Sequence, residues 1–284
     1  MILDWSDIPS INVNVLAYRR LLEIAAAGFH NLLLVGNDGL YPCSHVEMLA
    51  RRLPSILPPL TEEEQFITGV YDKTQRPIAS PHYTAQRLNV ESGDAFGGAL
   101  LLEDLPEYRR ECHQDILERP GWYFIVATAP HPERVGVLLQ AGLAPLFDMQ
   151  WGNLIHGLPA MPIQDDPEPS AAVLRRVARA WDAQDMRYGR GKRWRNGKSA
   201  DDVFARYALP TVDTDALERA AEIAADRFGL KHVDAELAPV CRVARTIADL
   251  RGSQAVQLQD LAEALDLRVL AEPPVKSSKQ RRAK

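Results

Sequence analysis

The chain has 284 residues and a formal net charge of −5, and its length predicts one large domain or two smaller ones. No apolar run reaches the ~18 residues of a membrane-spanning helix, and the N-terminal sequence MILDWSDIPS lacks the basic and apolar regions of a secretory signal, so neither a membrane protein nor a secreted one is expected. Three scattered cysteines, Cys43, Cys112 and Cys241, argue against a disulfide framework and predict a reducing, cytoplasmic setting.

Short apolar runs alternate with helical patterns in the first part of the chain, which predicts a parallel α/β sheet. The predicted strands are residues 31–35, 99–102, 123–127 and 143–147, and they are apolar enough to be buried on both faces. The predicted helices are residues 14–28, a segment of about ten residues that ends before Pro54, a short helix that begins at the capping box of Thr61 and Glu64, and residues 105–117 and 135–141.

The pattern changes beyond Gly157. Residues 158–169 contain four prolines and are predicted to be a linker. Helices are then predicted at residues 171–186, 214–228, 236–250 and 258–267, which together indicate a small helical domain. The polar, basic end of the chain, residues 273–284, is expected to be disordered.

Positive charge is concentrated in two short segments. Residues 187–198 hold six basic residues and no acid, and residues 273–284 hold five more and no acid. Removing those eleven charges from the net −5 leaves −16 on the rest of the chain. This split suggests a polyanion or an acidic surface as a partner.

The loop after the first predicted strand has the layout of a phosphate-binding loop. The stretch at residues 35–54, VGNDGLYPCSHVEMLARRLP, leads from an apolar strand through a glycine-containing loop into a helical pattern. Gly36, Asn37, Asp38 and Gly39 are therefore candidates for nucleotide binding. A P-loop also needs a lysine for the phosphates, and no lysine lies between Gly36 and the helix.

Longer strings carry a specific resemblance. They are LEIAAAGFHNLLLVG, MLARRLPSILPPLTEEE, RPIASPHYTA, LLLEDLPEY and VARTIADLRGS, and they occur in this order along the chain. Together they resemble the magnesium-chelatase-like AAA+ family, and within it the competence-type bacterial ATPases. The resemblance runs with gaps from about Asp4 to Leu267 and implies a three-layer P-loop core with a parallel sheet, followed by a helical lid. It also implies ATP and Mg²⁺ as ligands.

The residues that the family uses for nucleotide chemistry differ in this sequence. The lysine and threonine of the family's P-loop fall on Val46 and Glu47 in one register and on Pro42 and Cys43 in the other. The Asp-Glu pair that ends the Walker B strand, with Asp for magnesium and Glu for the attacking water, is here Glu103-Asp104. The sensor asparagine falls on Ala129, and two arginines of the family fall on Met149 and Ala235.

The basic segment is a second candidate site. Aromatic and cationic side chains interleave there as in proteins that contact phosphates and stack on bases. The candidate residues for nucleic-acid contact are Arg187, Arg190, Lys192, Arg193, Trp194, Arg195 and Lys198. The alternative is a solvated connector between domains, which the family also makes basic. No metal site is predicted, because Cys43-x-His45 and Cys112-His113 do not have the usual zinc-ligand spacings.

These observations predict an AAA+ core at residues 1–160, a Pro-rich and then basic connector at 161–205, a helical lid at 206–270 and a disordered tail at 271–284. Three functions stay open. The first is a degenerate, non-hydrolysing binding or regulatory subunit, possible partners being an AAA+ relative or a ring of such relatives. The second is an ATP hydrolase with an atypical site that uses Glu103 for magnesium. The third is a nucleic-acid-binding protein that uses the connector.

Overall fold

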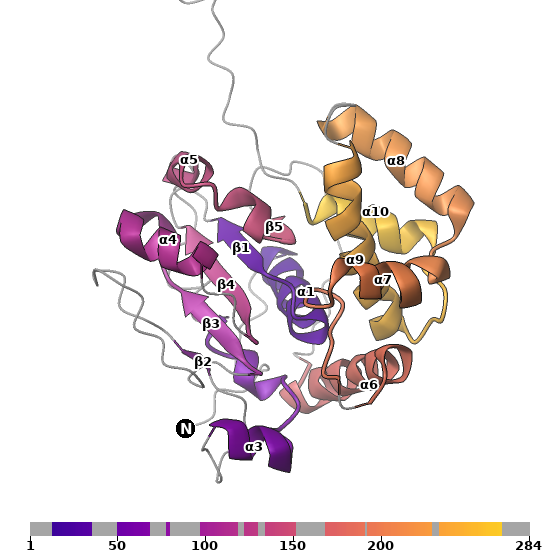
Figure 1. Ribbon diagram of the computed structural model, residues 1–284, viewed down its shortest axis with the longest axis horizontal. Coiled ribbons are helices and arrows are strands. Elements are labelled where there is room, and N and C mark those ends of the chain that lie inside the picture. Colours follow the sequence, from indigo (N-terminus) through magenta and orange to yellow (C-terminus); the bar gives the residue numbers. More distant parts are fainter. Residues whose placement is uncertain are drawn as a thin grey trace, which may run out of the picture.

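The protein contains a five-stranded parallel sheet with the strand order β2-β3-β4-β1-β5 (Figure 1). The computed structural model describes residues 13–35, 50–68, 78–79, 97–118, 122–129, 134–151, 168–190, 192–228 and 233–268. The strands are β1 (Leu32–Val35), β2 (Ile78–Ala79), β3 (Ala99–Leu102), β4 (Phe124–Ala129) and β5 (Met149–Trp151). All paired strands are parallel, which confirms the predicted α/β sheet.

Side chains alternate between the two faces of this sheet, and both faces are covered. Leu32 and Leu34 of β1 belong to one apolar cluster together with α1 (Val13–Gly28) and the C-terminal helices. Leu33 and Val35 belong to a second cluster, which includes side chains of α4 (Arg110–Glu118) and α5 (Val135–Gln140). The result is three layers, with α4 and α5 to the left of the sheet in Figure 1 and α1 to its right.

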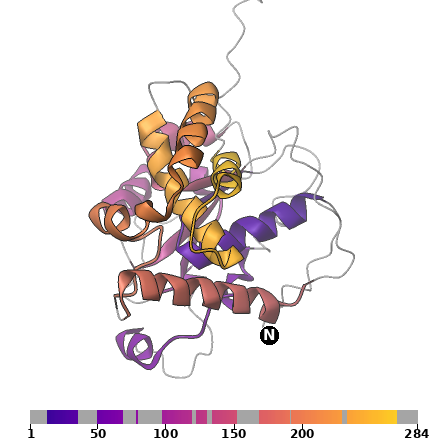
Figure 2. The same ribbon diagram turned by 90° about the vertical axis from the view of Figure 1, so that its right-hand side faces the viewer.

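The C-terminal part is helical. It consists of α6 (Ser170–Tyr188), α7 (Asp201–Tyr207), α8 (Thr214–Phe228), α9 (Val233–Arg251) and α10 (Leu258–Asp266). Helices α8 and α10 both pack on α9, while α6 and α9 both pack on α1 (Figure 2). Helix α9 is central because its buried face contacts neighbours along much of its length, with Val243, Ala244 and Ile247 at most 2% exposed.

Most of the predicted helices and strands are confirmed. A capping box lies at the beginning of one of the predicted helices. Helix α3 (Glu62–Thr68) begins where the backbone N–H and the hydroxyl of Thr61 donate to Glu64 Oε2 at 2.9 and 3.0 Å. The return bond from the Glu64 N–H to Thr61 Oγ1 is 3.3 Å long. The predicted domain boundaries stay predictions, and the tail at 271–284 lies outside the described residues.

The strand predicted at residues 143–147 is wrong. That stretch holds a 3-10 turn at Ala144–Leu146, and the strand comes next, at Met149–Trp151. Pro145 favours the turn because its ring fixes φ and it has no N–H to donate to a neighbouring strand. The predicted helix at 105–117 is likewise divided, with a 3-10 turn at Leu105–Glu107 and α4 beginning at Arg110. Strand β2 and helix α7 were not predicted.

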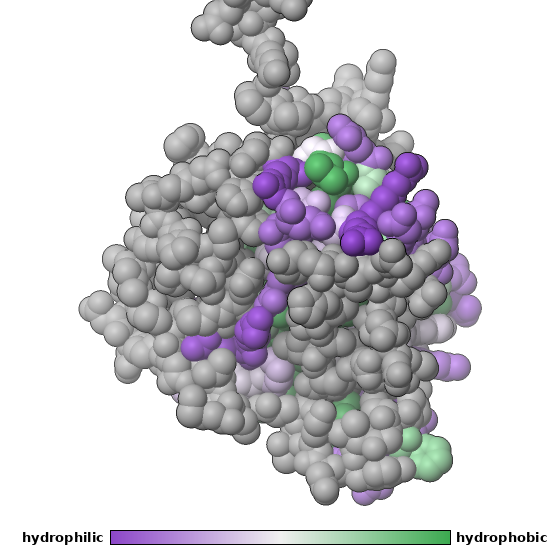
Figure 3. Space-filling view, turned by 90° about the vertical axis from the view of Figure 1, so that its left-hand side faces the viewer, coloured by the Kyte–Doolittle hydropathy of each residue, from purple (hydrophilic) through white to green (hydrophobic). Residues whose placement is uncertain are grey.

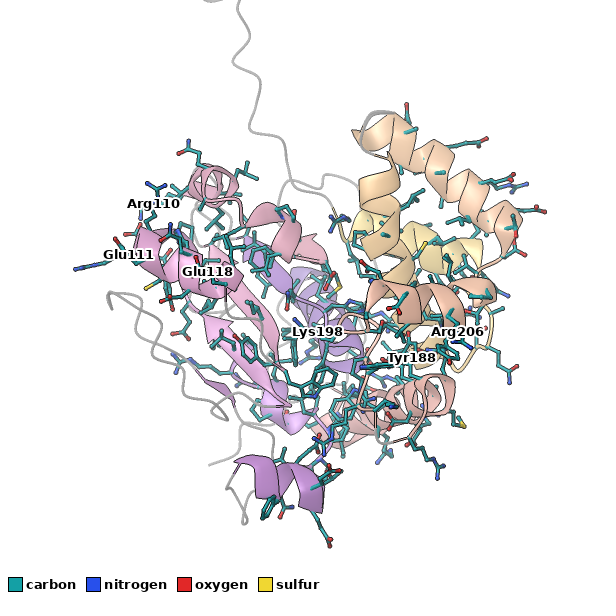
Figure 4. The ribbon with its side chains drawn as sticks, viewed as in Figure 1. Arg110, Glu111, Glu118, Tyr188, Lys198 and Arg206 are labelled. Atoms are coloured by element: carbon teal, nitrogen blue, oxygen red, sulfur yellow. The ribbon has the colours of Figure 1, made fainter. Side chains whose placement is uncertain are left out.

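The outer surface of α4 and α5 is mainly hydrophilic, with a small apolar spot (Figure 3). Arg110, Glu111 and Glu118 are exposed on α4 and point away from the sheet (Figure 4). Leu117, Val137 and Leu139 are the large apolar side chains that these two helices expose. Within the described residues, no helix combines the length and the apolar character needed to cross a membrane.

Candidate functional site

Two of the predicted nucleotide residues, Glu103 and Asp104, lie at the carboxyl edge of the sheet. In the register of the sheet Val35, the last residue of β1, pairs with Ala129, the last residue of β4, and Leu102 of β3 pairs with Ala127. Glu103 and Asp104 follow β3 directly, so they lie at the same edge as Ala129, where ligands of open α/β sheets bind. Residues Gly36 to Gly39 come next after β1 but lie outside the described residues.

Glu103 is engaged by a cation of the same chain. Arg51 donates to Glu103 Oε1 from Nε at 2.9 Å and lies within 2.7 Å of it through Nη2. The Arg51 side chain is 58% exposed and that of Glu103 is 22% exposed, so the pair lies at the surface of this edge. The carboxylate that the resemblance assigns to magnesium therefore has a cationic partner, in an exposed pair of the kind that is typically worth ~1 kcal/mol or less.

Asp104 has an unusual backbone conformation, with φ 53° and ψ 50°. This left-handed region is accessible to aspartate more readily than to most residues. The Asp104 N–H donates to Thr128 Oγ1 at 2.8 Å, and Thr128 is only 3% exposed. Thr128 of β4 thus holds the backbone of Asp104 in a sharp turn immediately after β3.

The positions that the resemblance assigns to γ-phosphate contacts are apolar. Ala129 at this edge and Met149 are both 0% exposed, and neither side chain can donate a hydrogen bond. Met149 pairs with Leu32, the first residue of β1, so it lies at the opposite end of the sheet. Ala235 lies in α9, and its side chain is not among those described. Over the described residues, no group of three or more His, Cys, Asp or Glu side chains could hold a metal ion. The donors described at this edge do not fit a magnesium–nucleotide.

The basic segment between α6 and α7 is tied to the body of the protein. Arg187 Nη1 donates to Asp249 Oδ2 at 3.0 Å, and Arg195 Nη1 donates to Asp185 Oδ1 at 2.6 Å. The Arg195 guanidinium also lies 4.5 Å from the centre of the Trp181 ring. These two arginine side chains are 12% and 9% exposed, so little of either is available to an external phosphate.

Of the remaining candidates in this segment, three have partners within the protein and two are exposed. Arg193 pairs with Glu63 at 2.7 Å, and the Lys198 ammonium donates to Asn31 Oδ1 at 3.2 Å. Lys198 lies between the sheet and the C-terminal helices (Figure 4), and its burial lowers the pKa of its ammonium. Trp194 packs its ring edge-on against Tyr188 at 6.4 Å. Arg190 and Lys192 are exposed, and nucleic-acid contact stays a prediction.

A buried polar network underlies the basic segment, and sequence reasoning missed it. Asn196 Nδ2 donates to both Thr246 Oγ1 and Asp249 Oδ2 at 3.0 Å. Arg245 is 0% exposed and donates from Nη2 to Asp249 Oδ1 at 3.0 Å. The signal available in the sequence was the i,i+4 spacing of Arg245 and Asp249 inside an otherwise apolar helix. The basic segment is therefore chiefly a structural connection to α9.

Asp148 joins this region to the sheet. Its Oδ2 accepts the Asn31 N–H at 3.0 Å and lies 3.5 Å from His30 Nδ1. Burial on its own would raise the pKa of Asp148, but the nearby His30 ring, the hydrogen bond from the Asn31 N–H and the positive charge of Lys198 lower the pKa from its ordinary value of 3.8. The carboxylate therefore stabilises the fold at neutral pH.

Acid is expected to remove this contribution. Because the folded pKa of Asp148 lies below the unfolded value of 3.8, the stabilisation is complete above that pH and is lost as pH falls through the folded pKa. Urea unfolding between neutral pH and about pH 3 should show a steeper loss of stability in the wild type than in Asp148→Asn. Equal pH dependence in the two proteins would remove Asp148 as a cause.

Comparison with known proteins finds two matching family models and several similar relatives. The family model described as "Magnesium chelatase, subunit ChlI" matches residues 12–120, and that of "Magnesium chelatase, subunit ChlI C-terminal" matches residues 167–268. Competence protein ComM of Haemophilus influenzae is 28% identical over 308 residues, covering 89% of this chain and 58% of that protein. The uncharacterized protein YifB of Salmonella typhimurium is 38% identical over 123 residues, or 36% of this chain and 23% of that protein. The chain thus spans less than two thirds of the length of these curated relatives.

Proposed function

Because the chain belongs to the magnesium-chelatase-like AAA+ family, which confirms the expected P-loop fold class, we propose that it is a non-hydrolysing member that acts as a binding or regulatory subunit. The observation that carries this proposal is that the sensor position, where the family has an asparagine, holds the buried apolar side chain of Ala129 at the carboxyl edge of the sheet. A hydrolysing site needs a polar group there and a carboxylate at the end of β3 for magnesium. Here that carboxylate, Glu103, pairs with the exposed Arg51.

The surrounding positions support the same conclusion. Phosphoryl transfer depends on positioning and on electrostatic stabilisation of the transferred group, and removing a single such donor commonly costs about 10²- to 10³-fold in rate. The P-loop lysine is missing, because no lysine lies between Gly36 and the helix predicted to follow it. Because these groups act as a unit their losses do not simply multiply, but the loss of even one of them would leave little hydrolysis.

The binding role follows from what the chain keeps. Over the described residues the chain keeps the parallel sheet, the α1–β1 unit and the C-terminal helices, which would offer a surface to an active AAA+ relative. The chain would then regulate that relative without turning over nucleotide itself. An ATPase with an atypical site is the alternative, and it requires Glu103 to exchange Arg51 for magnesium.

Calorimetric titration separates these two possibilities. With ATP at millimolar concentration, we expect no heat that depends on magnesium, which corresponds to a dissociation constant weaker than about 1 mM. The reason is that the magnesium-binding carboxylate is paired and that the described phosphate-sensing positions have no donors. The same titration in the presence of a chelator serves as the control. Magnesium-dependent binding in the micromolar range would instead favour the atypical ATPase.

A further inference from the structure

The C-terminal end of α1 is capped by a distant part of the chain. The last four carbonyls of a helix have no partner within the helix and must find one elsewhere. In α1 the partners are the His30 N–H for Ala25 at 3.2 Å, Trp181 Nε1 for Ala26 at 3.1 Å, Gln184 Nε2 for Ala27 at 2.9 Å and the Gly197 N–H for Gly28 at 2.8 Å. Three of these four donors come from α6 and the segment that follows it.

Two glycines allow these segments to come this close. A Cβ on Gly197 would lie 2.7 Å from the carbonyl oxygen of Phe29 and 2.8 Å from His30 Nδ1. A Cβ on Gly28 would lie 2.5 Å from Thr246 Oγ1. No side chain fits between the end of α1, the segment after α6, and α9.

A second connection lies at the edge of the sheet. The Gln150 N–H of β5 donates to the carbonyl of Leu267 at 2.8 Å, just after α10. Arg268 Nη1 donates to the carbonyls of Phe147 and Asp148 at 2.8 and 3.1 Å. The C-terminal helices are therefore attached to the sheet part at two separate places.

One apolar core also continues across the junction. The Phe29 ring, which follows α1, lies 5.1 Å from the Phe124 ring of β4 and 5.4 Å from the Trp181 ring of α6. All three side chains belong to the same buried cluster. Opening the junction would expose this cluster to water.

We propose that the sheet and the helices of residues 170–268 move as a single rigid body, so that no hinged lid operates between them. Each α1 carbonyl hydrogen bond that is exchanged for one to water would disfavour an opened state by about two- to 13-fold, and three such bonds would be lost together. This inference goes beyond the proposed function and is independent of whether the protein hydrolyses ATP, since it concerns only the junction.

Native-state hydrogen exchange of the full chain tests this proposal. The Gly197 and Gln150 amides report on the two connections, and the amides of β1 and β4 report on global unfolding. We expect the protection factors of the two reporters to agree with those of the strands within about tenfold, with or without magnesium–ATP. Exchange of either reporter more than about tenfold faster than the strands would reveal a hinge and overturn the proposal.

A pair of variants tests whether the close approach of the segments at Gly197 holds this junction together. In Gly197→Ala the added methyl group is expected to force the segments apart and to lower the protection of the Trp181 indole N–H and the Gln184 side-chain amide by more than about tenfold relative to the strands. Gly136→Ala is the matched control, because a Cβ there meets nothing within 4 Å. Unchanged protection in a folded Gly197→Ala would contradict the proposal. If Gly197→Ala does not fold, the wild-type measurement still decides.

Discussion

Replacing Asp249 with alanine is expected to destabilise the protein by about 4 kcal/mol, because it leaves buried cations without their carboxylate. The Asp249 side chain is 1% exposed and receives hydrogen bonds from Arg187, Arg245 and Asn196. Arg245 is itself fully buried. Breaking a buried ion pair by removing one partner typically costs ~3–5 kcal/mol, whereas an exposed pair is worth ~1 kcal/mol or less.

Denaturant unfolding at neutral pH measures this effect as a change in the free energy of unfolding. The matched control is Asp182→Ala on the exposed side of α6, which should change the stability by no more than ~0.5 kcal/mol. Asp249→Asn keeps the shape of the side chain but removes its charge, so it should fall between the two. A loss below about 1 kcal/mol in Asp249→Ala would mean that the network contributes little.

Gly28→Ala is expected to destabilise the protein by about 3 kcal/mol, the sum of overpacking and of a broken buried hydrogen bond. The new Cβ would lie 2.3 Å from His30 Nε2 and 2.5 Å from Thr246 Oγ1. These two atoms are 2.7 Å apart and both residues are 0% exposed. The methyl group therefore has nowhere to go without separating His30 from Thr246.

The control variant for Gly28→Ala is expected to change the stability in the opposite direction. Gly136 lies in α5 with open space around its Cβ position, so Gly136→Ala should stabilise the helix by up to ~1 kcal/mol. Both variants are compared in the same thermal or urea unfolding experiment. A Gly28→Ala protein as stable as the wild type would show that α1 and α9 can separate at this point without cost.

The sheet could be predicted from the sequence because its strands are short, continuous apolar runs. Residues 31–35 and 99–102 have the length and continuous apolar character typical of strands buried on both faces, and helix ends carried local signals such as Thr61 with Glu64. The fifth strand was misplaced because the apolar run before it contains Pro145, and apolar character alone does not distinguish a 3-10 turn from a strand. Strand β2 has only two residues and gives no periodic signal.

The polar interior could not be predicted, because its partners lie far apart in the chain. Arg187 meets Asp249 across 62 positions, and His30 meets Thr246 across 216. A basic segment such as residues 187–198 looks like a surface for nucleic acid when only its charges are counted. The acids that neutralise Arg187 and Arg195 become visible only in the structure.

Steady-state release of phosphate from ATP tests the central claim most directly. The wild type and Glu103→Gln should both give no release above the background without protein, in the presence of magnesium, because the P-loop lysine and the sensor asparagine are both missing. Turnover of the wild type at about 1 per second or faster, abolished in Glu103→Gln, would contradict the proposed function and identify Glu103 as a working magnesium ligand.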